Sequence, residues 1–321
     1  MKMKFAPIKF QAALAAGGVS LMAFNFLQFA LPHAGSLVKL TDIAWADLTV
    51  SKILAYSPLI GIMLISTAIN LILTIILLKG FLQLISNGKR FNGFISNTST
   101  NITIFAPIAS LSMTANVIWG PFSFFIPNLS IQSLILPSLI FFGILWGLLF
   151  LFEFKVMKIW LTNELDVDKL NFVWLLDVFA FALVSLTGTG IASMANDPKI
   201  ASTAAFASLF VLIIGVFLFV TKLAYLLYLQ IKRRDLPDKP IMPAFFLVIP
   251  IVCLFGLSFY RVMSYLAKTY AFDVSVISFA LITFSYVVTI GWGLFTVYLL
   301  FDYLRKDFYR SKFSPTQWGM V

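Results

Sequence analysis

Eight apolar segments follow one another along the chain, and each is long enough to cross a membrane as an α-helix. Such a helix needs about 20 consecutive apolar residues, because the hydrocarbon core of a bilayer is about 30 Å thick. None of the segments shows the alternation over about 10 residues that is typical of a strand in a membrane barrel. The sequence therefore predicts an all-α polytopic membrane protein, with a single transmembrane domain over 1–321. The predicted spans are 7–31, 53–85, 102–122, 131–160, 172–192, 201–229, 242–266 and 274–303.

The composition excludes the main alternatives to a membrane protein. Of the 321 residues, 60% are hydrophobic and only 11% are charged, whereas a soluble domain has about 45–50% apolar and about 25% charged residues. A soluble enzyme, a disordered chain and a nucleic-acid-binding domain are therefore excluded. No hydrophilic stretch is long enough to form a separate soluble domain.

The positions of the basic residues predict the orientation. If the N-terminus is cytoplasmic, 18 of the 23 Lys and Arg residues, including Lys2, Lys4 and Lys312, fall on the inner side of the membrane. The positive-inside rule favours this arrangement, so the net charge of +10 is mainly a topology signal. The first apolar run exceeds the 7–15 residues typical of a signal peptide core, and we interpret it as a retained span. We expect a multi-pass protein of the cell's inner (plasma) membrane.

Residues that carry out most enzymatic chemistry are scarce. The chain has one histidine, His33, and one cysteine, Cys253, which are too few for the usual His/Cys metal cluster. A Ser/His/Asp triad is also not expected, because His33 lies in a predicted outer loop. The string Thr187-Gly-Thr-Gly190 continues an apolar segment and lacks a third glycine, so it is no dinucleotide-binding motif. Cys253 lies in an apolar run and is expected in the core. The sequence predicts no catalytic residue, no metal and no cofactor.

Ionisable residues inside membrane spans are the usual pointers to function, and few are present. Asp177 is the best candidate: it is either a carboxylate hydrogen-bonded to a neighbouring helix, or a proton-coupling or ion site. Arg261, toward the outer end of its span, either extends to the membrane surface or attracts anions at a pore mouth. Glu153, Lys222 and Asp302 are expected to reach the cytoplasmic interface. This scarcity favours a passive or weakly coupled conduit over an ion-driven pump.

A weak repeat marks the odd-numbered spans. Phe5-Ala-Pro-Ile and Phe105-Ala-Pro-Ile stand near the starts of the first and third spans, and Val248-Ile-Pro-Ile lies within the seventh. Proline within a span frees a backbone carbonyl and bends the helix. Such defects are tolerated where they are buried in protein or line a wet cavity. The repeat therefore predicts that Pro107 and Pro250 form kinks beside a pore.

Four stretches of the chain resemble the tellurite-resistance/dicarboxylate transporter family, which includes the slow-type, voltage-dependent anion-channel-like proteins of plants. Phe5-Ala-Pro-Ile-Lys-Phe10 is similar to the family's first helix start, and Asn101-Ile-Thr-Ile-Phe-Ala-Pro107 is similar to its third. Leu236-Pro237, followed by Pro250, resembles the seventh. Lys312-Phe-Ser-Pro-Thr-Gln-Trp-Gly319 resembles the start of a ninth helix.

The resemblance implies ten helices arranged as five hairpins around a central pore, with the odd-numbered helices lining one pore in each protomer of a homotrimer. It also implies a phenylalanine from helix nine that blocks the pore. Gln11 stands where the family has a glycine, which would narrow or re-polarise the pore. Four hairpins and a stub at 313–321 match, so we expect that the chain stops before its last hairpin. The gate is then expected beyond Val321.

The candidate pore-lining residues lie on the odd-numbered spans and combine prolines, small residues, hydroxyls and phenylalanines. They are Phe10, Gly17, Phe105, Pro107, Ser110, Thr114, Ser185, Thr189 and Pro250. Hydroxyl dipoles, helix ends and positive pore mouths can select anions without a fixed internal charge. Alternatively, Ser, Thr and Gly residues in these spans mediate helix packing in lipid.

The predicted function is a channel or transporter for small anions, with the lipid bilayer and the anions as partners and no nucleic acid. C4-dicarboxylates, sulfite, tellurite-related ions and halide-like ions are all compatible with the sequence. The first alternative is a proton- or cation-coupled carrier that uses Asp177. A membrane-embedded enzyme is less favoured, because no polar catalytic cluster is visible.

Overall fold

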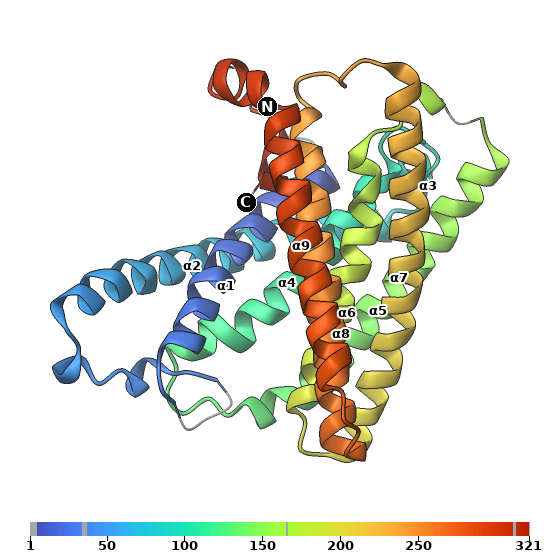
Figure 1. The fold of residues 1–321 in the computed structure, drawn as a ribbon. Coiled ribbons are helices and arrows are strands. Elements are labelled where there is room, and N and C mark those ends of the chain that lie inside the picture. Colours follow the sequence, from blue (N-terminus) through green and yellow to red (C-terminus); the bar gives the residue numbers. More distant parts are fainter. Residues whose placement is uncertain (1–4, 34–36, 165, 311–312, 321) are drawn as a thin grey trace.

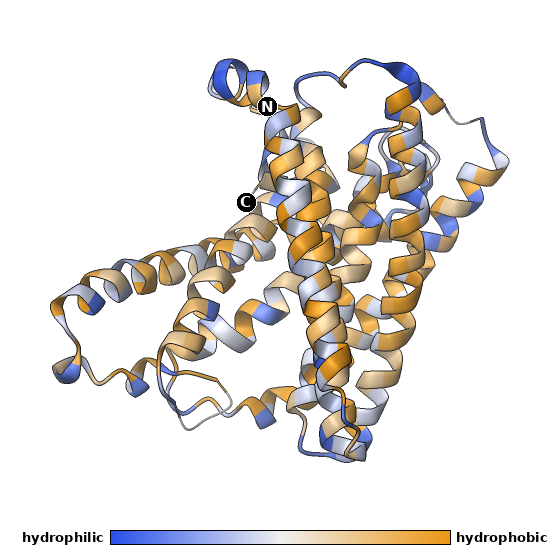
Figure 2. Ribbon diagram, viewed as in Figure 1, coloured by the Kyte–Doolittle hydropathy of each residue, from blue (hydrophilic) through white to orange (hydrophobic). Residues whose placement is uncertain are grey.

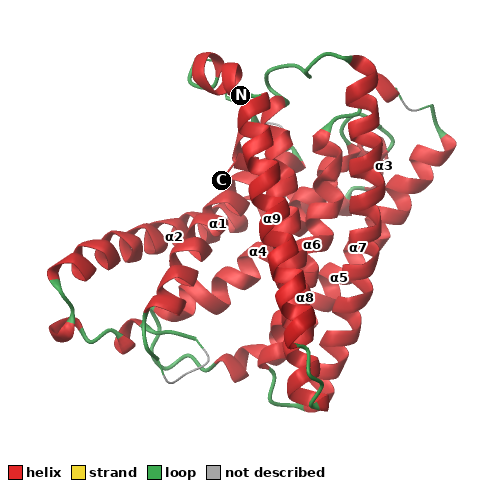
Figure 3. Ribbon diagram, in the orientation of Figure 1, coloured by secondary structure: helices red, strands yellow, loops and turns green. Residues whose placement is uncertain are grey.

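The computed structural model describes residues 5–33, 37–164, 166–310 and 313–320. Lys2, Lys4 and Lys312, which were predicted on the inner side of the membrane, and Val321 lie outside these residues. The described residues form helices and connecting loops, with no strand among them (Figure 3). Within this part of the chain, eight helices are long and apolar enough to cross a membrane. The predicted all-α polytopic class is confirmed.

Each odd-numbered span begins with a 3-10 turn that continues into an α-helix. These turns and helices are Pro7–Lys9 with α1 (Phe10–Ala30), Asn101–Ile104 with α4 (Phe105–Val117), Phe172–Leu175 with α6 (Leu176–Met194), and Met242–Leu247 with α8 (Val248–Tyr270). Pro107 and Pro250 are each the third residue of their α-helix. Proline is tolerated in the first helical turn, where its missing N–H costs least. Each of these prolines therefore stands in the first turn of an α-helix, just after a 3-10 turn. The kinks that the repeat predicts at these positions stay a prediction.

The even-numbered spans are longer and run without such turns. They are α2 (Val50–Ser86), α5 (Ile131–Thr162), α7 (Pro198–Arg233) and α9 (Ser275–Leu299), and the short α3 (Gly88–Ile95) follows α2. At 1.5 Å per residue, the 37 residues of α2 extend about 55 Å. This exceeds a hydrocarbon core of about 30 Å, so α2 must tilt or emerge from the bilayer.

Burial alternates between the odd and even spans. In the most apolar part of each odd span, the buried share is 56, 89, 89 and 56% in chain order, against 22, 28, 39 and 0% in the even spans. The odd spans therefore form an inner layer, and the even spans form an outer layer that exposes apolar side chains. Figure 2 shows hydrophobic residues along the long helices and hydrophilic residues gathered at their ends. This distribution suits an outer layer that faces lipid.

The inner helices pack in an arc from α1 through α4 and α6 to α8. The outer helices α2, α7 and α9 pack on the inner helices that precede or follow them, and α1 and α2 lean away from the long helices α7–α9 (Figure 1). The 3-10 helix Pro315–Met320 contacts both α1 and the turn Met242–Leu247. It therefore lies where the arc of inner helices is open, between its first and last members.

Lys39 connects two loops at the end of the bundle opposite the odd-helix starts. Its Nζ donates to the backbone oxygens of Ser123 at 2.7 Å, Leu129 at 3.3 Å and Ile126 at 3.4 Å. Burial lowers the pKa of Lys39, and the negative charge of Asp42 acts in the opposite direction. The ammonium provides hydrogen-bond donors for three loop carbonyls and holds the α1–α2 loop against the α4–α5 loop.

A close approach of three helices centres on Gly188 of α6. A Cβ atom placed there would lie 2.6 Å from the ring of Phe142 in α5 and would collide with the hydroxyl of Ser208 in α7. Small residues permit such close contact between membrane helices, where van der Waals packing replaces the hydrophobic effect. The tight fit around Gly188 therefore fixes α6 between α5 and α7.

We predict that Gly188→Ala destabilises the protein by about 1–3 kcal/mol, the typical cost of overpacking a close-packed interior. Gly147 in α5 is a matched control, because a Cβ atom there meets no neighbour within 4 Å. Gly147→Ala should leave stability unchanged or raise it, since alanine favours helix. Thermal unfolding of both variants in the same detergent measures the difference. Equal melting temperatures for the two variants would contradict the close packing described here.

Candidate functional site

A cavity of about 390 Å³ lies between α1, α8 and Pro315–Met320, and we call it the inner cavity. From α1 it is lined by Gln11, Leu14, Ala15, Gly18, Met22 and Asn25. From α8 and the turn before it come Phe246, Leu247, Ile249, Pro250, Cys253 and Leu254. Met113 of α4, Phe179 of α6 and the C-terminal Trp318, Gly319 and Met320 complete the lining. All four odd spans therefore contribute to one cavity.

The lining of the inner cavity is mostly apolar and contains no charged side chain among the described residues. Its polar side chains are the amides of Gln11 and Asn25, the thiol of Cys253 and the indole of Trp318. Cys253 was expected in the core, but it is exposed and its Sγ lies 3.2 Å from the hydroxyl of Thr289. Its helix turns it toward the cavity, a direction that hydropathy alone does not reveal. An ion in this cavity would meet dipoles and no fixed charge.

A second, much smaller pocket adjoins the inner cavity at the end where the odd spans begin. It has a volume of about 10 Å³, which is room for about one water molecule. Gln11, Leu247 and Gly319 line both spaces. These three residues therefore stand between the two spaces, and we call them the constriction.

Of the apolar and glycine residues predicted to line a pore, Pro250 lies in the wall of the inner cavity. Phe105 and Pro107 are buried in the inner layer. Phe10 is also buried and packs edge-on against Phe81 of α2, with ring centroids 5.9 Å apart. Gly17 is covered by Met113, whose Cγ would lie 2.6 Å from an added Cβ. The last four residues fill contacts between helices.

The predicted hydroxyl residues also lie between helices. Thr114 pairs with Thr74 at 3.0 Å, and Ser185 donates to Ser258 at 3.0 Å. Thr189 donates to a backbone oxygen of its own helix at 3.1 Å. These bonds join inner helices to their neighbours or close on the same helix, as the packing alternative expects.

Two further polar residues of the inner layer join α4 to α6. Ser112 donates to the backbone oxygen of Leu183 at 2.8 Å and lies 2.7 Å from the hydroxyl of Thr187. Asn116 donates to the same hydroxyl at 2.8 Å. By contrast, the buried hydroxyl of Ser110 has no hydrogen-bond partner among the described residues. The interface between α4 and α6 therefore contains a connected polar network.

Arg261 bonds to the inner layer and does not line the inner cavity. Its Nη1 donates to the backbone oxygen of Leu186 at 3.2 Å, and it lies beside Gly190. The guanidinium thus satisfies a carbonyl of α6, which links α8 to α6 toward the end opposite the constriction.

Asp177 belongs to a charged cluster between the inner helix α6 and the outer helices α5 and α7. It is fully buried and forms an ion pair with Lys222 of α7. Glu153 of α5 interacts electrostatically with both residues and is 2% exposed. The Lys222 ammonium also lies 4.6 Å from the centroid of the Trp160 ring. Two carboxylates thus share one ammonium.

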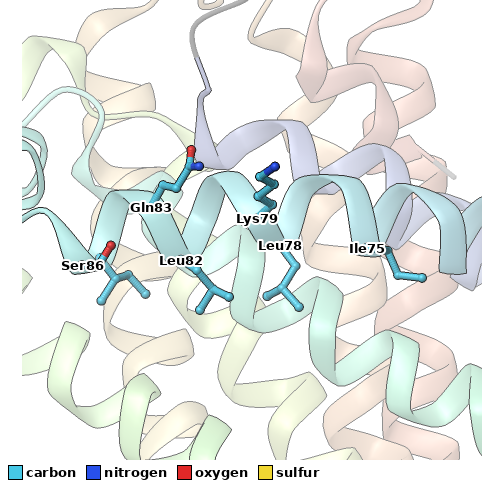
Figure 4. A pocket seen from close by; sticks show the side chains of 7 residues that line it. Ile75, Leu78, Lys79, Leu82, Gln83 and Ser86 are labelled. Atoms are coloured by element: carbon cyan, nitrogen blue, oxygen red, sulfur yellow. The ribbon is translucent and has the colours of Figure 1, made fainter.

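A hollow of about 590 Å³ lies apart from the inner cavity. All the residues that line it belong to α2, between Ile75 and Ser86. Figure 4 shows Leu78 and Leu82 pointing to one side of the helix, and Lys79 and Gln83 pointing to the other. A hollow along one outer helix is a surface feature. The inner cavity is smaller, but it is enclosed by several helices.

No group of three or more His, Cys, Asp or Glu residues in the described ranges is arranged to hold a metal ion. The arrangement therefore consists of a helical bundle with an uncharged internal cavity that narrows at one end. These features define a class, the multi-pass membrane proteins with an internal cavity.

The chain belongs to the SLAC1 family, described as voltage-dependent anion channels, because the sequence model of this family matches residues 4–321. The predicted family resemblance is confirmed. No curated protein and no solved structure gives a significant match. Family membership identifies the protein as an anion channel or transporter of the membrane.

We predict that Lys222→Met destabilises the protein by about 3–5 kcal/mol, because it leaves the buried carboxylates of Asp177 and Glu153 without a positive charge. The double variant Lys222→Met/Asp177→Asn removes one of these two carboxylates and should recover part of the loss, since the carboxylate of Glu153 stays. Thermal unfolding in detergent measures both. If the double variant were as unstable as the single one, the charge pairing would not be the cause.

Proposed function

We propose that the protein passes small monovalent anions across the membrane through the inner cavity and the constriction. The observation that carries this proposal is one cavity, walled by all four odd spans, without a charged side chain in its lining. The proposal places the protein in the plasma membrane with a cytoplasmic N-terminus. The basic residues of the inner loops support that orientation.

The helix directions favour anions over cations. Because the odd spans alternate with even spans, α1, α4, α6 and α8 all begin at the same end of the bundle. The N-terminus of a helix carries a partial positive charge. The first turns of α1, α4 and α8 contain no acidic residue, whereas that of α6 contains Asp177, which pairs with Lys222. No carboxylate lines the inner cavity or the small pocket. This electrostatic pattern supports anions over cations.

The lining also favours singly charged anions among the candidate substrates. Sites for dicarboxylates and other divalent anions need arginine or lysine partners to offset the cost of dehydrating two charges. The inner cavity offers amides, one thiol and an indole. We therefore propose halide-like ions ahead of C4-dicarboxylates, sulfite and tellurite-related ions.

A conduit accounts for the inner cavity better than an enzyme does. Covalent catalysis needs a nucleophile with a base in hydrogen-bond reach, and Cys253 has a threonine hydroxyl beside it.

We also propose a homotrimer, which the family resemblance implies. The apolar surface of α9, in which only Thr296 is buried, supports contact with lipid or with other protomers. A protein mass of one protomer in lipid nanodiscs would contradict the trimer.

The single cysteine allows a direct test of the path. Because Cys253 is exposed in the inner cavity, an anionic methanethiosulfonate reagent should attach there and block most chloride flux in proteoliposomes through bulk and repulsion. Cys253→Ser should conduct like the unmodified protein and ignore the reagent. If mass spectrometry shows complete labelling of Cys253 and the chloride flux is unchanged, the result contradicts the proposed path. No chloride flux from the unmodified protein would contradict the proposed function.

The charged cluster supports a second candidate, a proton-coupled carrier. Glu153, Asp177 and Lys222 carry two negative charges and one positive charge when fully ionised, so one proton makes the cluster neutral. Burial of an excess charge is costly, and this cost gives the cluster a reason to bind a proton. The cluster is separate from the inner cavity, so coupling would act through movement of α6.

We predict that a proton gradient leaves chloride flux unchanged, as a channel requires. Under a fixed chloride gradient, an inward proton gradient should alter the initial chloride flux by less than about twofold, since a factor of two is below 1 kcal/mol. A larger stimulation of the chloride flux would favour the proton-coupled carrier instead, provided that Glu153→Gln or Asp177→Asn abolishes it and Asp302→Asn keeps it. Asp302 is a suitable control because it is an exposed carboxylate paired with Lys306.

A further inference from the structure

We infer that the side-chain amide of Gln11 binds the permeating anion at the constriction and sets which anions pass. This inference rests on the proposed function and adds a selectivity residue to it. Gln11 is the second residue of α1 and is one of three residues shared by the inner cavity and the small pocket. An anion that moves between the two spaces must therefore pass beside it.

The hydrogen bonding of Gln11 points to a ligand. The side chain is 8% exposed, and its Oε1 is buried with no hydrogen-bond partner within the described chain. A buried polar atom without a partner is costly, and most buried polar groups in proteins are paired. Because Oε1 is an acceptor, its missing partner is a donor such as water in the adjoining spaces, while the N–H groups of the same amide are the atoms that can bind an anion.

The chemistry of the amide suits an anion. A glutamine side chain carries two N–H donors and an acceptor oxygen, and rotation of the amide plane by 180° exchanges them. It can therefore donate to an anion from the same position in which it bonds to water. The other two residues of the constriction, Leu247 and Gly319, have no polar side chain. Gln11 is thus the one side-chain donor among the three residues of the constriction.

The surroundings of Gln11 strengthen the interaction. The only other polar side chain in the small pocket is Thr316, and its hydroxyl already bonds to the backbone oxygen of Pro240. Gln11 lies in the first turn of α1, and Leu247 immediately precedes α8. Both helix N-termini add a favourable potential for negative charge. A hydrogen-bond donor that lies in this positive potential and away from bulk water offsets part of the hydration energy that the anion loses.

Gln11→Met tests the inference, because methionine has a similar length and no hydrogen-bond donor. A hydrogen bond to a charged partner is worth at least about 1.4 kcal/mol, or tenfold. Chloride loses more hydration energy at a constriction than thiocyanate does, so chloride depends more on the donor. Bi-ionic reversal potentials of the full chain in planar bilayers should show the chloride-to-thiocyanate permeability ratio falling about tenfold.

Gln83→Met is the matched control. Gln83 is an exposed glutamine of the outer helix α2 and lines neither the inner cavity nor the small pocket. The control should leave the permeability ratio unchanged. If Gln83→Met lowered the ratio as much as Gln11→Met, the amide at the constriction would not be the cause, and the inference would fail.

Gln11→Glu provides a second test should the methionine variant not assemble. Glutamate keeps the shape of the side chain but places a negative charge at the constriction, and chloride flux at neutral pH should fall by at least about tenfold. Suppose that the wild-type protein conducts chloride. If Gln11→Met then keeps the wild-type permeability ratio, or Gln11→Glu keeps the wild-type chloride flux, the inference fails while the proposed function stands. A wild-type protein that passes no anion overturns the proposed function itself.

Discussion

The packing of α6 against α4, α5, α7 and α8 is the interaction on which the rest of the structure depends. Lipid tails are as apolar as leucine, so helices in a bilayer associate through close packing and interhelical hydrogen bonds. α6 supplies both: Gly188 allows contact with its outer neighbours, and Thr187 joins the polar network with Ser112 of α4. With α6 held in this way, α4 and α8 take places on either side of it, and the cavity lies at the open side of the arc.

Much of the fold could be predicted from the sequence, because a bilayer imposes strong rules on length and hydropathy. Eight apolar runs predicted eight helices, and the proline strings pointed to the odd-numbered spans. The inner and outer layers differ in ways that a single sequence shows only weakly, since α2 and α6 are both strongly apolar. The role of Pro107 and Pro250 depended on where each α-helix begins, and a 3-10 turn shifts that point by several residues.

The site was harder to predict because polarity does not reveal the direction in which a side chain points. Ser185 and Thr114 were chosen for their hydroxyls, and both lie between helices. Cys253 looked like a core residue and lines the cavity, since the rotation of α8 decides its exposure. One signal was present in the sequence: Gln11 is an amide in the first turn of an apolar span. The pairing of Asp177 with Lys222 joins residues 45 positions apart and depends on tertiary structure.

The uncharged lining of the inner cavity has a kinetic consequence. A path that offers dipoles alone holds an ion weakly, and weak binding shortens the time that each ion spends inside. If anions pass through the inner cavity as proposed, the flux rises with concentration long before the path saturates. The direction of net movement then follows the electrochemical gradient, and the flux responds in proportion to the surroundings.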